Sequence, residues 1–184
     1  PGGEQERLPQ ELLHNTFYAG GQAEFNESFA NFVGARGSEA FFRSRGHERA
    51  AAEVVARWGD EKLMAVFWKR LYNDMDSVFK AHPGDSLVHR RLLLRDSVYR
   101  SARDALVFRI GPQLRTIAPR QVEQVRLDNA ALLARRIYLT DVDLFDSVYV
   151  REGRDTRRAI ERVIEIAKSN EDDPFEALRR WVVR

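Results

Sequence analysis

Three residues near the start of the chain have the types and the spacing of a hydrolytic metal site. Glu11 and His14 are three residues apart, so a helix would place them on the same face. Glu27 follows beyond Gly20-Gly21, a pair that predicts a turn between two helices. Two histidines and one glutamate are a common ligand set for a catalytic zinc, which keeps its fourth position for water. We therefore expect Glu11 to act as a general base beside a zinc ion that His14 and Glu27 bind.

Position 10 departs from this ligand pattern. In the sequence His-Glu-x-x-His the first histidine also binds zinc, but this chain has Gln10 there. A neutral carboxamide is a poorer zinc ligand than imidazole. Pro9 fits the first turn of a helix better than its interior, and residues 1–8 show no apolar periodicity. These features favour a chain that is truncated or altered at its N-terminus, while a true substitution in a natural pseudoenzyme stays open.

The residues around these positions resemble a known family. The runs Glu11-Leu12-Leu13-His14 and Asn26-Glu27-Ser28-Phe29-Ala30 are similar to the HELxH and NESFA motifs of predicted bacterial aminopeptidases, which are gluzincin-like metallopeptidases. Asn129 and the run from Tyr138 to Phe145 also resemble the C-terminal half of that family. The resemblance therefore covers the chain from residue 11 onward.

The resemblance implies an activity, a cofactor and a substrate. It implies a zinc-dependent peptidase, an aminopeptidase in particular, which hydrolyses bonds in a peptide or protein. It also implies Zn²⁺ as the cofactor, with Glu27 as the third ligand beside His14 and the residue at position 10. Because the family resemblance implies export or lipid anchoring in many members, it favours the bacterial cell envelope or periplasm over the cytoplasm.

Two further residues are candidates for contact with a substrate. Tyr138 and Asn129 carry hydrogen-bond donors of the kind that stabilise an oxyanion opposite a catalytic metal. The alternative is that Tyr138 belongs to the core and that the Asn129 amide is satisfied by the main chain. Both readings stay open at the level of the sequence.

The rest of the chain is patterned as helices that must position these residues. Apolar residues recur every three to four positions over residues 50–79, 87–110, 119–139 and 159–167. Asp173-Pro174 has the residue types of a helix start. We expect a break near Gly59, and we expect Asn129 on the apolar face of the third of these helices.

These patterns predict an all-α fold. We expect a multi-helix bundle that corresponds to the C-terminal part of a zincin-like metallopeptidase. Residues 1–8 are expected to form a flexible tail, and residues 9–184 are expected to form a single helical metallopeptidase-like domain.

Composition argues against several other classes of protein. The chain has 30 basic and 28 acidic residues and a net charge of +2, so we expect no binding to nucleic acid. It has no cysteine, so disulfides and thiolate metal sites are excluded. No apolar run approaches the length of a membrane span, so no transmembrane segment is predicted in this chain.

Two alternatives to a peptidase are compatible with the sequence. A non-catalytic helical interaction module predicts that Glu11, His14 and Glu27 lie apart. A pseudopeptidase predicts that they converge, with Gln10 standing where a ligand is needed.

Overall fold

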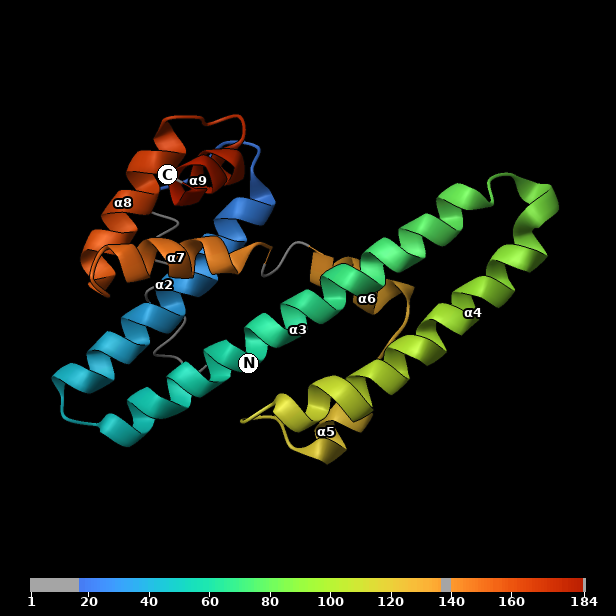
Figure 1. The fold of residues 1–184 in the computed structure, drawn as a ribbon, viewed down its shortest axis with the longest axis horizontal. Coiled ribbons are helices and arrows are strands. Elements are labelled where there is room, and N and C mark those ends of the chain that lie inside the picture. Colours follow the sequence, from blue (N-terminus) through green and yellow to red (C-terminus); the bar gives the residue numbers. More distant parts are fainter. Residues whose placement is uncertain (1–16, 137–139, 184) are drawn as a thin grey trace. The chain divides into compact units, whose positions relative to one another are not determined.

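The computed structural model describes residues 17–136 and 140–183, which form helices joined by turns (Figure 1). The all-α, multi-helix architecture is confirmed, and the described residues contain no strand. The α-helices are α2 (Ala23–Ser44), α3 (Glu48–Ala81), α4 (Val88–Ala105), α5 (Pro119–Glu123), α6 (Asn129–Arg136), α7 (Val142–Arg151), α8 (Thr156–Lys168) and α9 (Pro174–Val183). Leu106–Ile110 continues α4 as a π-helix, and Asp85–Leu87 and Gly111–Gln113 are short 3₁₀ segments.

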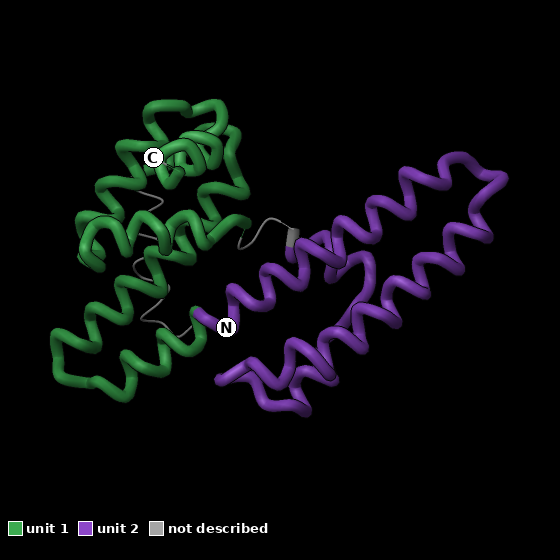
Figure 2. The backbone as a smooth tube through the Cα atoms, in the orientation of Figure 1, with its two compact units in different colours: residues 1–58, 137–184 green, residues 59–136 purple. Residues whose placement is uncertain are grey.

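The chain divides into two compact units (Figure 2). Unit 1 contains residues 1–58 and 137–184, and unit 2 contains residues 59–136. Helix α3 passes from unit 1 to unit 2 without the break expected near Gly59, because one glycine inside a long helix costs only about 1 kcal/mol. The single domain over residues 9–184 stays a prediction, and the tail over residues 1–8 lies outside the described part of the chain.

The core of unit 1 is a cluster of aromatic side chains. Phe25, Phe29 and Phe32 recur on one face of α2, and their ring centroids lie 5.5–5.7 Å from that of Phe145 on α7. None of these four side chains is more than 1% exposed. Truncation of a buried ring of this kind costs about 3–5 kcal/mol, so the cluster fixes the face of α2 that turns inward.

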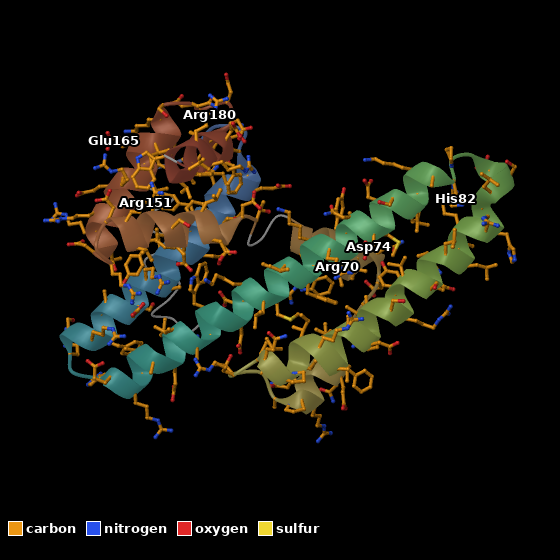
Figure 3. All side chains as sticks on the ribbon, in the orientation of Figure 1. Arg70, Asp74, His82, Arg151, Glu165 and Arg180 are labelled. Atoms are coloured by element: carbon orange, nitrogen blue, oxygen red, sulfur yellow. The ribbon has the colours of Figure 1, made fainter. Side chains whose placement is uncertain are left out.

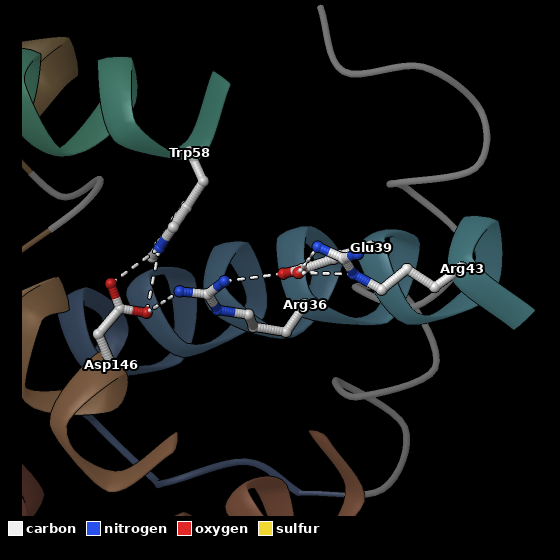
Figure 4. A network of polar contacts seen from close by, with 5 residues as sticks. All are labelled: Arg36, Glu39, Arg43, Trp58 and Asp146. Carbon is white, nitrogen blue, oxygen red and sulfur yellow. Dashed lines mark hydrogen bonds and ion pairs between the residues drawn. The ribbon is translucent and has the colours of Figure 1, made fainter. Parts of the chain in front are cut away.

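A network of ion pairs joins α2, α3 and α7 (Figure 4). Arg36 donates to Asp146 at 2.7 Å and to Glu39 at 2.8 Å, and its guanidinium carbon lies 4.4 Å from the Tyr149 ring centroid. The Trp58 indole N–H donates to both carboxylate oxygens of Asp146 at 3.1 Å. Burial lowers the pKa of Arg36, but the hydrogen bonds and charges of Asp146 and Glu39 outweigh burial and raise this pKa above its ordinary value. Arg36 is therefore charged at neutral pH.

Unit 2 is built on a helical hairpin in which α4 returns beside the second part of α3 (Figure 1). A buried carboxylate on α3 anchors the loop that follows the π-helix. Asp60 is 1% exposed and accepts hydrogen bonds from the main-chain N–H groups of Arg115 and Thr116, at 2.8 and 2.6 Å, and from the Thr116 hydroxyl at 2.7 Å. These donors take the place of water around the buried carboxylate.

The chain forms two helices, α5 and α6, where a single helix over residues 119–139 was expected. Asn129 is exposed, so its expected position on an apolar helix face is wrong. Arg103 donates to the main-chain carbonyls of Glu123 and Val125 at 3.1 and 2.5 Å, which satisfies them where α5 ends. Asp128 then accepts the Ala131 N–H at 2.8 Å at the start of α6. Asn129 is the first residue of α6 and is exposed.

Helix α8 begins with a side-chain cap. Asp155 accepts the Arg158 main-chain N–H at 3.0 Å, which satisfies one of the amides that a helix start leaves unpaired. We expect Asp155→Ala to lower the free energy of unfolding by about 1 kcal/mol, measured by urea denaturation. Asp155→Asn retains an acceptor and should lie close to the unsubstituted protein. Equal losses in the two variants would contradict the role of the cap.

Among the described residues, no helix has both the length and the apolar character that a membrane crossing requires. A location in the cell envelope stays a prediction.

Candidate functional site

Glu27 lies in the second turn of α2, and its side chain is half-buried. Its carboxylate has no hydrogen bond or ion pair with any described residue, whereas Glu39 on the same helix pairs with both Arg36 and Arg43. Asn31 donates to the main-chain carbonyl of Glu27 at 2.9 Å. The carboxylate oxygens of Glu27 are therefore left available to bind a ligand.

The residue before Glu27 fastens the preceding loop to α2. Asn26 is 4% exposed, and its carboxamide bonds both main-chain groups of Ala19. The Ala19 N–H donates to Asn26 Oδ1 at 2.9 Å, and Asn26 Nδ2 donates to the Ala19 carbonyl at 2.8 Å. These two bonds thus hold the loop that contains Ala19 against the turn of α2 that carries Glu27.

The residue after Glu27 fastens a different part of the chain. Ser28 is fully buried, and its hydroxyl accepts the main-chain N–H of Thr140 at 2.8 Å. Thr140 lies two residues before α7 and two residues after Tyr138. Thr140, just before α7, is therefore joined to α2 next to Glu27.

Phe29 and Ala30 complete the motif in the core. Phe29 is fully buried and Ala30 is 3% exposed. Phe17 packs edge-on against Phe25 and Phe29, with ring centroids 6.5 and 6.3 Å apart. Four of the five residues in the NESFA run are thus buried, and Glu27 is the member of the run whose side chain has no hydrogen bond or ion pair with a described residue.

Of the other residues expected at the site, the structure describes only Asn129. Gln10, Glu11, His14 and Tyr138 lie outside the described residues. Asn129 belongs to unit 2, whereas Glu27 belongs to unit 1.

The side chain of Asn129 is engaged within unit 2. Its Oδ1 accepts the Tyr99 hydroxyl at 2.6 Å. Burial raises the pKa of Tyr99, and the charge of Asp128 raises it further, so the hydroxyl is protonated and donates at neutral pH. The role of Asn129 in contact with substrate stays a prediction.

The buried hydrogen bonds of Asn26 and Ser28 were not predicted from the sequence. A sequence pattern that could have identified these residues is a polar residue on an otherwise apolar face of a helix. Both lie among Phe25, Phe29 and Ala30, all of which the helical period buries. A buried polar side chain needs a partner, so each marks a long-range hydrogen bond.

Among the described residues, Glu27 is a candidate zinc ligand, but these residues do not provide a complete set of ligands. A half-buried, unpaired glutamate carboxylate is a donor of the type that catalytic zinc sites use. Within residues 17–136 and 140–183, no group of three histidine, aspartate or glutamate side chains is placed to hold a metal ion. Glu27 thus has the chemistry of a zinc ligand, and the zinc cofactor stays a prediction.

Two hollows elsewhere on the surface are each lined by residues of one unit. Figure 3 labels Arg70 and Asp74 from the first and Glu165 and Arg180 from the second. A groove of about 400 Å³ lies between α3 and α4, lined in part by Arg70 and Asp74, whose Nε and Oδ2 atoms are 3.9 Å apart. A second hollow of about 340 Å³ lies between α8 and α9, lined in part by Glu165 and Arg180. Neither is lined by Glu27 or contains a metal-ligand cluster of described residues.

Comparison with known proteins adds one finding. A family model described as "Putative aminopeptidase" matches residues 6–178. Comparison with curated proteins and with solved structures gives no match. The family match includes the ExxH run, the NESFA run and the described helices as far as α9. Since it spans nearly the whole chain, the protein belongs to this aminopeptidase family.

Proposed function

We propose that this protein is a zinc-dependent peptidase in which His14 and Glu27 bind the metal and Glu11 is the general base. Membership of an aminopeptidase family supports hydrolysis of a peptide or protein substrate. The single observation that carries the zinc proposal is the Glu27 carboxylate, which is half-buried and has no hydrogen bond or ion pair with any described residue, while Asn26, Ser28 and Phe29 beside it are buried.

The connection between the two motifs supports the same proposal. Phe17 contacts the rings of Phe25 and Phe29, which flank Glu27 on α2. His14 precedes Phe17 by three residues, and three residues of extended chain span at most about 11 Å. The chain between Phe17 and His14 is therefore short enough for His14 and Glu27 to bind the same metal ion, as proposed.

Each residue has a distinct task in this proposal. When bound by His14 and Glu27, zinc would supply Lewis-acid chemistry to the site. Glu11 would accept a proton from the attacking water and return it to the leaving amine. Glu27 would contribute a negative charge to the metal site. Tyr138 is a further candidate for a donor to the oxyanion.

Gln10 weakens the site in this chain. It occupies the position of the first histidine ligand, and a carboxamide binds zinc poorly. We therefore expect Gln10→His to raise zinc affinity by at least about tenfold and to increase peptidase activity. A pseudopeptidase is the second candidate, and Gln10 is the residue that favours it.

The test uses the full chain with Gln10→His as the parent. Zinc content is measured by metal analysis after dialysis, affinity by competition with a chromophoric chelator, and activity on a fluorogenic aminoacyl amide and on a longer peptide. We expect one zinc per chain, and we expect Glu27→Gln to lower zinc affinity by about 100-fold or more. Glu53→Gln removes the same charge from an exposed side chain of unit 1 and should change nothing.

Three results would separate the candidates. A parent that binds no zinc, or one whose zinc affinity is unchanged by Glu27→Gln, overturns the metal site. Peptide binding without hydrolysis by the unsubstituted chain, with zinc binding and hydrolysis gained in the Gln10→His parent, supports the pseudopeptidase. Equimolar zinc with hydrolysis that Glu11→Gln abolishes supports the peptidase.

A further inference from the structure

The carboxamide of Asn26 completes a turn from inside the protein. Ala19, Gly20, Gly21 and Gln22 form the turn that leads into α2, and the Gln22 N–H donates to the Ala19 carbonyl at 3.2 Å. Gly21 has φ of +75°, which L side chains rarely adopt. The Ala19 carbonyl accepts a second hydrogen bond from Asn26, which also receives the Ala19 N–H.

This pair of bonds requires an amide side chain of this length. One side chain must donate and accept at the same time, within a site where Asn26 is 4% exposed and Ala19 is also 4% exposed. Aspartate can accept but not donate when it is ionised, and leucine of similar size can do neither. The bonds are sheltered from water, so their loss leaves two buried main-chain groups of Ala19 unpaired.

We propose that Asn26 is a positioning residue for the metal site, and that it fixes the segment after His14 relative to the Glu27 carboxylate. This inference rests on the proposed function. Asn26 adjoins Glu27 on the same turn of α2, and its partner Ala19 is five residues from His14. The two bonds thus link the helix that carries one ligand to the chain that carries the other. A metal site loses affinity when the residues that orient its ligands are removed.

A second contact holds the same turn from its outer side. Gln22 Nε2 donates to the Asp172 carbonyl, in the loop between α8 and α9, at 2.6 Å. This bond is exposed, whereas both bonds of Asn26 are buried. The positioning energy therefore comes mainly from Asn26, because exposed hydrogen bonds compete with water.

The experiment compares Asn26→Leu with Ser28→Ala, each in the Gln10→His parent. Ser28 is also buried and also flanks Glu27. Its partner Thr140, however, is far from His14 in the sequence, so this bond does not hold the segment that follows His14. We measure zinc affinity by chelator competition, unfolding by urea, and hydrogen exchange of the Ala19 amide in metal-free protein. We expect Asn26→Leu to weaken zinc binding by about 10–100-fold and to accelerate Ala19 exchange. Ser28→Ala should leave both near the parent values.

The outcomes are separable. Zinc affinity of Asn26→Leu equal to that of the parent overturns the inference and leaves the proposed function standing. Equal losses of affinity in Asn26→Leu and Ser28→Ala also overturn it, because general destabilisation would then explain the effect. A parent that binds no zinc overturns the proposed function and the inference with it. Loss confined to Asn26→Leu, with faster exchange of Ala19 in the metal-free state, establishes the positioning role.

Discussion

Replacing Asp146 by alanine is expected to lower the free energy of unfolding by about 3–5 kcal/mol. The side chains of Arg36 and Asp146 are 13% and 14% exposed, so the substitution leaves a buried guanidinium without its main counter-charge. It also removes both acceptors of the Trp58 indole N–H, which is buried. Arg36 retains Glu39, but Glu39 is shared with Arg43 (Figure 4). Urea denaturation followed by tryptophan fluorescence measures the loss.

A double variant tests the physical reason for this loss. Arg36→Met combined with Asp146→Ala removes both charges, so it should be more stable than Asp146→Ala alone. Glu161→Ala is the matched control, because its ion pair with Arg157 is exposed and worth at most about 1 kcal/mol. A loss below 1 kcal/mol for Asp146→Ala would show that the network does not hold α2 against α7.

Replacing Asp60 by alanine is expected to lower the free energy of unfolding of unit 2 by about 3 kcal/mol. The carboxylate is 1% exposed and is the acceptor for two main-chain N–H groups and one hydroxyl in the loop at Arg115 and Thr116. Hydrogen bonds to a charged acceptor are worth more than neutral ones, and all three disappear together. Amide hydrogen exchange over residues 59–136 measures the effect within this unit.

Graded variants separate the contributions at Asp60. Asp60→Asn retains one acceptor oxygen and should lose less than Asp60→Ala, while Thr116→Val removes only the hydroxyl bond and should cost about 1 kcal/mol. If exchange at the amides of residues 115 and 116 is unchanged in Asp60→Ala, the carboxylate does not anchor this loop.

The sequence alone was sufficient for the class of fold and for several helix limits. Helical periodicity and caps depend on neighbours three or four residues away, so a local pattern reports them directly. The cap at Asp173 is an example, since it accepts the Glu176 N–H at 2.9 Å and α9 begins at Pro174 as predicted. The spacing of Phe25, Phe29 and Phe32 likewise shows which face of α2 is buried.

Local patterns did not reveal where helices are interrupted by distant groups. The break between α5 and α6 occurs where Arg103, some twenty residues earlier in the chain, donates to main-chain carbonyls of Glu123 and Val125. Residues 119–139 carry a continuous apolar period, so periodicity predicted a continuous helix there. Periodicity could not predict the interruption, because the hydrogen bonds from Arg103 come from a distant part of the chain.

The candidate site likewise has features that the local sequence predicts and features that depend on distant contacts. The sequence by itself determined that Glu27 has the residue type and spacing of a metal ligand, because that argument needs only the chemistry of a carboxylate and its place on a helix. Only the tertiary structure decided that Glu27 has no partner among the described residues while Asn26 and Ser28 bind Ala19 and Thr140. The partner of a buried polar group depends on which segments pack beside it, and Thr140 lies 112 residues away along the chain.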